Sequence, residues 1–255
     1  MILKQVVTQI IRLFLALALG NIIGLATFAF FAIVSYALKI WELEITADFV
    51  SFSEVNYSFT LGAFMLVGSL IAGFIYSRLE GPRSHGPADL MVCIKKDELP
   101  DIKAGFITSL LTMVSVSSGS SVGMFGPIIH YGGCIAASLE RFFKVLTRGV
   151  VLAAGGAAGI AALFSAPIAA SIFAHEMLLR RFRSTESLPV IMAALGGYFS
   201  AVMLLGDNRR FLSVIGDPPP LEPFSLGMAI LVGIFSGLLS SLYVYLVGAG
   251  PGWVK

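Results

Sequence analysis

Long stretches without a charged residue dominate this sequence. A helix needs about 20 apolar residues to cross the hydrocarbon core of a bilayer. The uncharged stretches near or above that length are residues 13–38, 58–77, 105–139, 150–174, 188–205 and 226–247. Charged residues make up only 13% of the chain, against about 25% in ordinary soluble domains. A water-soluble core cannot bury this excess of apolar residues, so we predict an all-α, multi-pass integral membrane protein.

The N-terminal stretch has one feature of a secretory signal, because Lys4 and Arg12 precede an apolar run. A signal core has about 7–15 apolar residues, whereas this run continues to Leu38. We therefore predict that it is the first spanning helix and is not cleaved.

Basic residues are distributed unevenly among the connections. Lys and Arg cluster in the loops 78–103, 140–149 and 175–187, while the segments 39–57 and 206–225 contain few of them. Connections rich in Lys and Arg stay on the cytoplasmic side of a membrane. We predict that the N-terminus and the three basic loops face the cytoplasm, in a plasma or inner membrane.

Two uncharged runs, 105–139 and 150–174, have a basic loop on both sides. Each run must therefore enter the membrane and return, as two half-helices with a break between them. Ser and Gly crowd residues 117–127 and a Pro lies in residues 165–167, and such residues interrupt helices. We predict broken, re-entrant helices at both places.

A broken helix within a membrane is a candidate site. Its free backbone amides cost several kcal/mol each unless protein, water or a ligand satisfies them. Where a half-helix begins, these N–H groups and the positive end of the helix dipole favour an anion. Gly126 and Pro127 form such a start, since Pro is common in the first helical turn. This pattern predicts an anion site.

Three segments resemble motifs of the CLC family of chloride channels and transporters. Residues 119–133 resemble its signature, a Gly- and Ser-rich approach followed by Gly, a variable residue, Glu, Gly, Pro and an apolar helix. Residues 83–89 are similar to its short Gly-Ser-Gly-Ile-Pro loop, and residues 154–177 are similar to its glycine-rich helix pair. The resemblance covers nearly the whole chain but about half of the family's fold, and it implies the first of two inverted repeats.

The resemblance implies an anion site built from two of these segments. Its candidate anion-binding residues are Ser84, His85, Gly123, Met124, Phe125, Gly126 and Pro127. The register of the upstream loop leaves two alternatives. Matching the family's proline without a gap puts Ser84 at the coordinating serine position, whereas matching a His-Gly pair of some bacterial relatives puts His85 there.

Two departures from the family pattern concern protons. Phe125 stands at the position of the gating glutamate, and Met177 stands at that of the inner proton-accepting glutamate. Glu176 matches only the first of two adjacent glutamates. Because neither Phe nor Met titrates, the resemblance implies passive chloride movement, as in a voltage-gated CLC channel, without proton-coupled exchange.

The resemblance also bears on length and assembly. Residues 226–247 resemble the helix that opens the family's second half, so we expect 1–255 to be one CLC-like transmembrane domain, truncated after that helix. Alternatives are a non-conducting subunit or gene fragment that needs a second half, and an unrelated secondary transporter with broken helices. The expected partners are chloride or another small anion and the lipid bilayer. A homodimer through 150–174 and 188–205 is implied by the resemblance alone.

Other chemical interpretations lack supporting residues. Residues 119–123 fit the G-x-S-x-G pattern, with His130 nearby, but that motif needs a strand-turn-helix context and an acidic partner. His85 and Asp89 would supply two metal ligands, where a site needs three or four. The net charge of +2 does not indicate nucleic-acid binding. We expect no enzymatic activity, no cofactor, no bound metal and no nucleic-acid partner.

Overall fold

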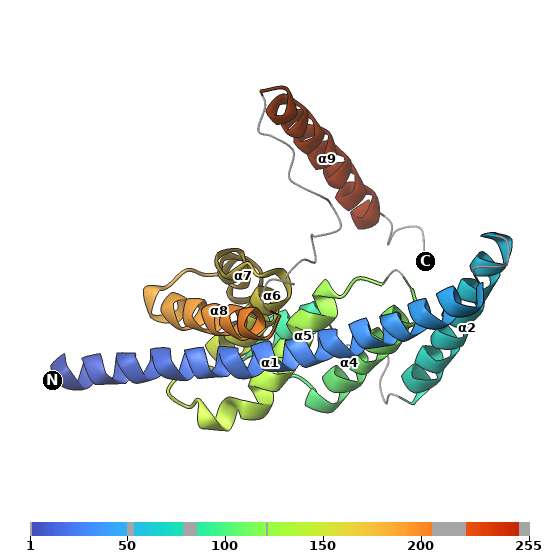
Figure 1. Ribbon diagram of the computed structural model, residues 1–255. Helices are drawn as coiled ribbons and strands as arrows, with labels where there is room; N and C mark the ends of the chain where they lie inside the picture. The colour runs from blue at the N-terminus through green and yellow to red at the C-terminus, as the bar shows by residue number, and fades with distance from the viewer. Residues whose placement is uncertain (1, 50–53, 79–85, 121, 206–222, 250–255) are drawn as a thin grey trace. The chain divides into compact units, whose positions relative to one another are not determined.

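The computed structural model describes residues 2–49, 54–78, 86–120, 122–205 and 223–249, and the regular elements in these ranges are helices (Figure 1). In chain order they are α1 (Ile2–Phe49), α2 (Glu54–Ser77), α3 (Pro87–Lys96), α4 (Ile102–Ser117), α5 (Phe125–Leu139), the 3₁₀-helix η1 (Glu140–Phe142), α6 (Arg148–Phe164), α7 (Pro167–Phe173), the π-helix η2 (Ala174–Leu179), α8 (Ser184–Leu205) and α9 (Pro223–Ala249). The predicted all-α class is confirmed. Residues 1–209 form one compact unit and 210–255 another.

Helix length separates spanning helices from shorter ones. Among the described residues, helices long and apolar enough to cross a membrane are found over Gln5–Ala37, Ser184–Leu204 and Leu226–Leu246. Helix α4 has 16 residues and so rises about 24 Å, less than the ~30 Å of a hydrocarbon core. The uncharged run 105–139 is therefore divided into helices shorter than a full span.

The connections between helices are shorter in the structure than the sequence predicted. Helix α1 continues to Phe49 and α2 begins at Glu54, so most of the segment 39–57 is helical. Within the predicted loop 78–103, α3 begins with Pro87 and ends with two lysines, which are common helix start and stop signals. Residues 206–222, from the other segment predicted to be external, lie outside the described residues.

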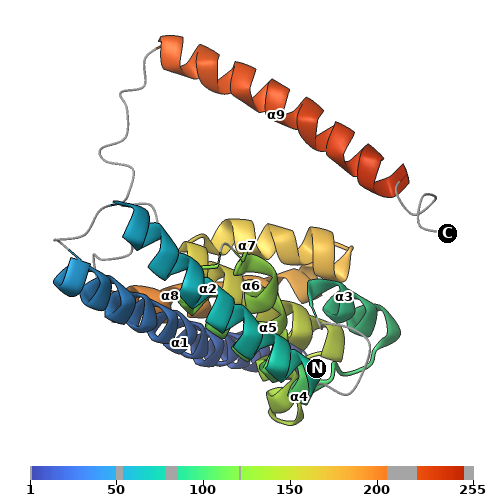
Figure 2. The same cartoon turned by 90° about the vertical axis from the view of Figure 1, so that its right-hand side faces the viewer.

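Helices α1 and α8 lie side by side (Figure 1; Figure 2 gives the view turned by 90°), and small residues bring their backbones into contact. A Cβ atom added to Gly20 would collide with the carbonyl of Ala193, and one added to Gly24 would lie 2.8 Å from the carbonyl oxygen of Gly197. The Ser200 hydroxyl bonds to Asn21 Oδ1 at 2.8 Å. Close approach of backbones through Gly and Ala is typical of helix packing in membranes. Because residue numbers rise together along both helices, α1 and α8 run parallel.

Helix α6 is the centre of this unit. Its residues from Gly149 to Ala162 are all buried, between α5, α8 and α1. It packs antiparallel to α5: a Cβ atom on Gly155 would lie 2.5 Å from the carbonyl oxygen of Gly132, and one on Gly159 would lie 3.1 Å from that of Ile128. The pair of helices predicted from the glycine-rich sequence is thus held by backbone contact.

Arg148, at the start of α6, contacts residues in two of the connections between helices. Its Nε lies 3.3 Å from Glu140 Oε1, and its guanidinium donates to the carbonyl oxygen of Asp97, directly after α3. A Cβ atom on Gly149 would lie 3.4 Å from the side chain of Ile94 and 4.0 Å from that of Leu179. The basic connections after α3, α5 and η2 therefore lie at one end of the bundle, where α8 and the parallel α1 also begin. Their cytoplasmic location stays a prediction.

Candidate anion-binding site

The run 105–139 is broken where its sequence predicted a break. Helix α4 ends at Ser117 and α5 begins at Phe125. Between them Gly119 has a φ of 86°, a left-handed conformation that Gly adopts without steric cost. The Ser118 hydroxyl donates to the carbonyl oxygen of Ser115 at 2.8 Å and helps to end α4. The prediction that 117–127 is not one continuous helix is confirmed.

The start of α5 carries no side-chain cap. The first N–H groups of a helix have no partner within it, and Met124, the N-cap residue, supplies none. Pro127 has no N–H, so the amides of Phe125 and Gly126 are the donors of this first turn. Gly123 and Phe125 are exposed, while Met124, Gly126 and Pro127 are half-buried. Anion binding at this helix start stays a prediction.

The start of α3 lies against the start of α5. A Cβ atom on Gly126 would lie 3.5 Å from Cγ of Pro87, which joins the two motif segments predicted to share the site. The Gly86 amide donates to Asp89 Oδ2 at 3.0 Å, so this carboxylate caps α3. A negative charge at a helix start competes with an incoming anion.

Ser84 and His85, the alternative coordinating residues, lie outside the described residues. Which of the two faces the start of α5 stays a prediction. The described neighbour Gly86 is the N-cap of α3, so the segment that contains both candidates leads directly into this helix start.

Phe125 is held by two aromatic side chains. Its ring centroid lies 5.7 Å from that of Phe164 and 5.4 Å from that of Phe173, both in edge-to-face arrangements. Phe164 ends α6 and Phe173 ends α7. The third motif segment therefore meets the signature segment at Phe125, next to the contact between Gly126 and Pro87. Phe125 remains 41% exposed, so these contacts do not bury it in the core.

The second predicted break is also present. Helix α6 ends at Phe164 and α7 begins at Pro167, with Ser165 between them at a φ of 53°. Helix α7 continues into the π-helix η2, which contains Glu176 and Met177. Both side chains are exposed. π-Helical turns are frequent at functional sites, and the structure places the predicted proton-acceptor position in one.

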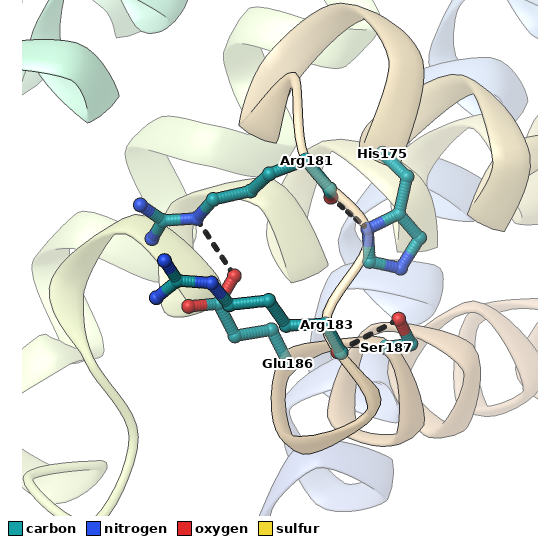
Figure 3. A network of polar contacts seen from close by, with 5 residues as sticks. All are labelled: His175, Arg181, Arg183, Glu186 and Ser187. Atoms are coloured by element: carbon teal, nitrogen blue, oxygen red, sulfur yellow. Dashed lines mark hydrogen bonds and ion pairs between the residues drawn. The ribbon is translucent and has the colours of Figure 1, made fainter.

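Two histidines lie in the interior. His130, in α5, is 1% exposed, and its Nδ1 lies 3.6 Å from Cys134 Sγ. His175, in η2, is 3% exposed, and its Nδ1 lies 3.2 Å from the carbonyl oxygen of Arg181, as Figure 3 shows. Across the described ranges, no group of three or more His, Cys, Asp or Glu residues could hold a metal ion. These contacts place both histidines in helix packing.

The aromatic contacts of Phe125 were not predicted from the sequence. Phe164 was noted only as part of a motif, and Phe173 lies in an apolar run where nothing distinguishes it from its neighbours. The contact with Phe173 depends on the direction in which α7 leaves the break at Ser165. An aromatic residue on each side of a predicted break is the signal that could have suggested them.

Comparison with known proteins agrees with the motifs. The family model described as "Voltage gated chloride channel" matches residues 68–255. A "Voltage-gated ClC-type chloride channel ClcB" of Salmonella dublin is 26% identical over 93% of this chain and 58% of its own length. The proteins of the same name from Yersinia pseudotuberculosis and Shigella flexneri are 29% and 27% identical, over 68% and 72% of this chain and 44% of their own lengths.

The chain thus spans about half the length of the curated relatives it matches. The family match covers both helix breaks and the start of α5, and it agrees with the apolar helices of a membrane protein. This integral membrane protein belongs to the voltage-gated chloride channel family.

Proposed function

We propose that this chain forms the first half of a passive pathway for chloride, with the start of α5 as one wall of the anion site. The observation that carries the proposal is the meeting of three segments at one point. Pro87 of α3 lies against Gly126, and Phe164 and Phe173 enclose Phe125. A helix start without a side-chain cap lies among them.

One helix start is too weak to hold chloride without help. A helix end stabilises a nearby charge by about 0.3–2 kcal/mol, whereas stripping a small ion of its water costs on the order of 20 kcal/mol in an idealised low-dielectric medium. Asp89 at the start of α3 weakens that second helix end for anions. The proposal therefore includes further donors from a second half of the protein, from retained water or from a second chain.

Proton coupling is excluded from the proposal because the side chains it needs do not titrate. Phe125 and Met177 are both exposed, and neither can carry a proton. His130, the nearest alternative in sequence, is buried within α5 beside Cys134 and α4. Movement of chloride through such a site would be driven by its own gradient alone.

The test is a flux assay in liposomes that contain the complete natural product of the gene. We expect chloride to leave the liposomes without proton movement, as reported by a pH-sensitive dye. Uphill proton movement driven by a chloride gradient would contradict passive transport. A correctly folded preparation with no chloride flux would instead favour a non-conducting subunit.

A homodimer is a separate part of the proposal. The outer faces of α7 and α8 expose large apolar side chains, among them Ile168, Ile191 and Met203. In a membrane this exposure is compatible with lipid as well as protein, so the support for a dimer comes from the family. Crosslinking in membranes, followed by measurement of the mass of the product, tests it independently of flux.

A further inference from the structure

A cavity of about 570 Å³ lies between α3 and η2. Its apolar lining is provided by Ala88, Met91, Val92, Ile94, Leu178 and Leu179. Its other lining residues are Lys95, Arg180 and Arg181, and all three are exposed. No acidic side chain from the described ranges lines it. The cavity thus combines an apolar floor with a purely cationic rim.

The three cations of the rim differ in whether they already form an ion pair within the described residues. Within the described part of the chain, Lys95 and Arg180 take part in no ion pair. Arg181 Nε lies 2.8 Å from Glu186 Oε2, which leaves its two terminal nitrogens outside that pair. In the view of Figure 3, Arg181 and Arg183 extend in the same direction from the connection between η2 and α8.

Local backbone geometry sets the positions of the two arginines. The π-helix ends at Leu179, and Arg180 adopts a left-handed conformation with a φ of 54°. The Arg181 carbonyl oxygen lies 3.2 Å from Nδ1 of the buried His175. Arg181 is therefore fixed through its backbone by His175 and through its side chain by Glu186. A fixed guanidinium loses less entropy when it binds an anionic group.

The cavity lies at the end of the bundle where the basic connections gather. Lys and Arg near the ends of membrane helices interact with lipid headgroups, while their stems and neighbouring apolar residues contact acyl chains. A small hydrated anion would use the rim and leave the apolar floor uncovered. A neutral lipid would cover the floor and leave the cations without a partner. An anionic phospholipid satisfies both parts.

We propose that this cavity binds one anionic phospholipid. The phosphate lies at the rim, against Lys95, Arg180 and the terminal nitrogens of Arg181, and an acyl chain covers Met91 and Leu178. None of residues 123–127 lines this cavity, and its occupancy can be measured without any flux.

The experiment measures lipid retained by the complete natural protein. The protein is extracted from nanodiscs of phosphatidylcholine mixed with phosphatidylglycerol, and bound lipid is counted by native mass spectrometry. We expect one retained phosphatidylglycerol and no comparable retention of phosphatidylcholine. Equal retention of the two lipids, or none of either because another part of the protein fills the cavity, would overturn the proposal.

Charge variants locate the headgroup. The double variant Lys95→Gln, Arg180→Gln should weaken retention by about fivefold for each charge removed, the effect of a basic residue near an anionic lipid. The matched control is Arg141→Gln, Lys144→Gln, which removes two cations from another connection at the same end of the bundle. An equal loss of lipid retention in the control would mean that general surface charge causes the effect, and this would contradict a defined site.

An apolar variant separates a phospholipid from free phosphate. Met91→Trp fills the floor and keeps every cation. It should lower phosphatidylglycerol retention, and addition of inorganic phosphate should not displace the lipid from the unchanged protein. Displacement by phosphate, with no effect of Met91→Trp, would show that the rim binds free anions only. Circular dichroism and gel filtration of each variant exclude loss of folding as the cause.

Discussion

The interface between α5 and α6 and the start of α5 use glycine for opposite purposes. At the interface, Gly132 and Gly155 let two backbones touch, and an added Cβ atom would collide with backbone. At the start of α5, a Cβ atom on Gly126 would make only an ordinary contact of 3.5 Å with Pro87. The first region leaves no room for another atom. The second has a helix start without a side-chain cap beside the half-exposed Phe125.

This difference separates two parts of one helix pair: the interface, which stabilises the fold, and the start of α5, which we propose binds an anion. Close packing of small residues replaces the hydrophobic effect, which is weak between helices surrounded by lipid. The helix start is less tightly packed at Gly126, and we propose that its residues serve ion binding. Substitutions in the two regions should therefore have different consequences.

The largest expected effect comes from Gly155→Ala. Its Cβ atom would lie 2.5 Å from the carbonyl oxygen of Gly132, and overpacking against backbone costs about 1–3 kcal/mol or more. We expect a clear loss of thermal stability in detergent. The matched control is Gly126→Ala, which adds the same methyl group where space exists. Equal destabilisation by both variants would remove the distinction between the two regions.

The next effect concerns flux rather than stability. Phe125→Glu places a carboxylate at the start of α5, and a charge there is worth about 0.3–2 kcal/mol. We expect flux to fall by up to about thirtyfold as pH rises through the ordinary pKa of Glu, ~4.3, because the ionised form competes with chloride. Liposome flux at several pH values measures this.

Phe125→Leu is the control for that experiment, since it changes shape without adding a titratable group. Its flux should show no such dependence on pH. Phe125→Glu should not restore proton coupling while Met177 remains. A variant whose flux is the same at every pH would mean that Phe125 does not lie on the pathway.

A smaller effect is expected from the aromatic contact between Phe125 and Phe173. Edge-to-face pairs contribute about 0.5–1.5 kcal/mol beyond area burial. A double-mutant cycle with Phe125→Leu and Phe173→Leu should give a coupling free energy of that order from thermal unfolding. A cycle that pairs Phe125→Leu with Phe142→Leu is the control and should give none, because Phe142 is an exposed residue of η1, beyond the other end of α5. Additive effects in both cycles would mean that Phe125 is not held in place.

The smallest effect is expected at the Arg148 contacts. Its ion pair with Glu140 is about one-third exposed, and such pairs contribute about 0–1 kcal/mol. Arg148→Gln should lower stability within that range, and Arg148→Lys should recover only part of it because Lys lacks the planar fork that also reaches Asp97. If Arg148→Gln lowered the melting temperature as much as Gly155→Ala, the connections would contribute as much to the stability of the bundle as the interface between α5 and α6.

The sequence alone determined the class of protein, the two helix breaks and the family. Uncharged runs, Pro and Gly positions and the order of three motifs are local properties of the chain, and local physical rules connect them to membrane helices and their interruptions. The correspondence of Phe125 to the family's gating glutamate and of Met177 to its inner proton-accepting glutamate is likewise a prediction from the motifs.

Tertiary structure decided which residues surround the start of α5. The contact between Gly126 and Pro87 joins segments about 40 residues apart in the chain, and Phe125 meets Phe173 only because Ser165 turns α7 back toward it. The cavity between α3 and η2 likewise combines Lys95 with Arg180. Sequence spacing cannot supply such contacts, because the direction of a chain after a helix break depends on the packing of the helices around it.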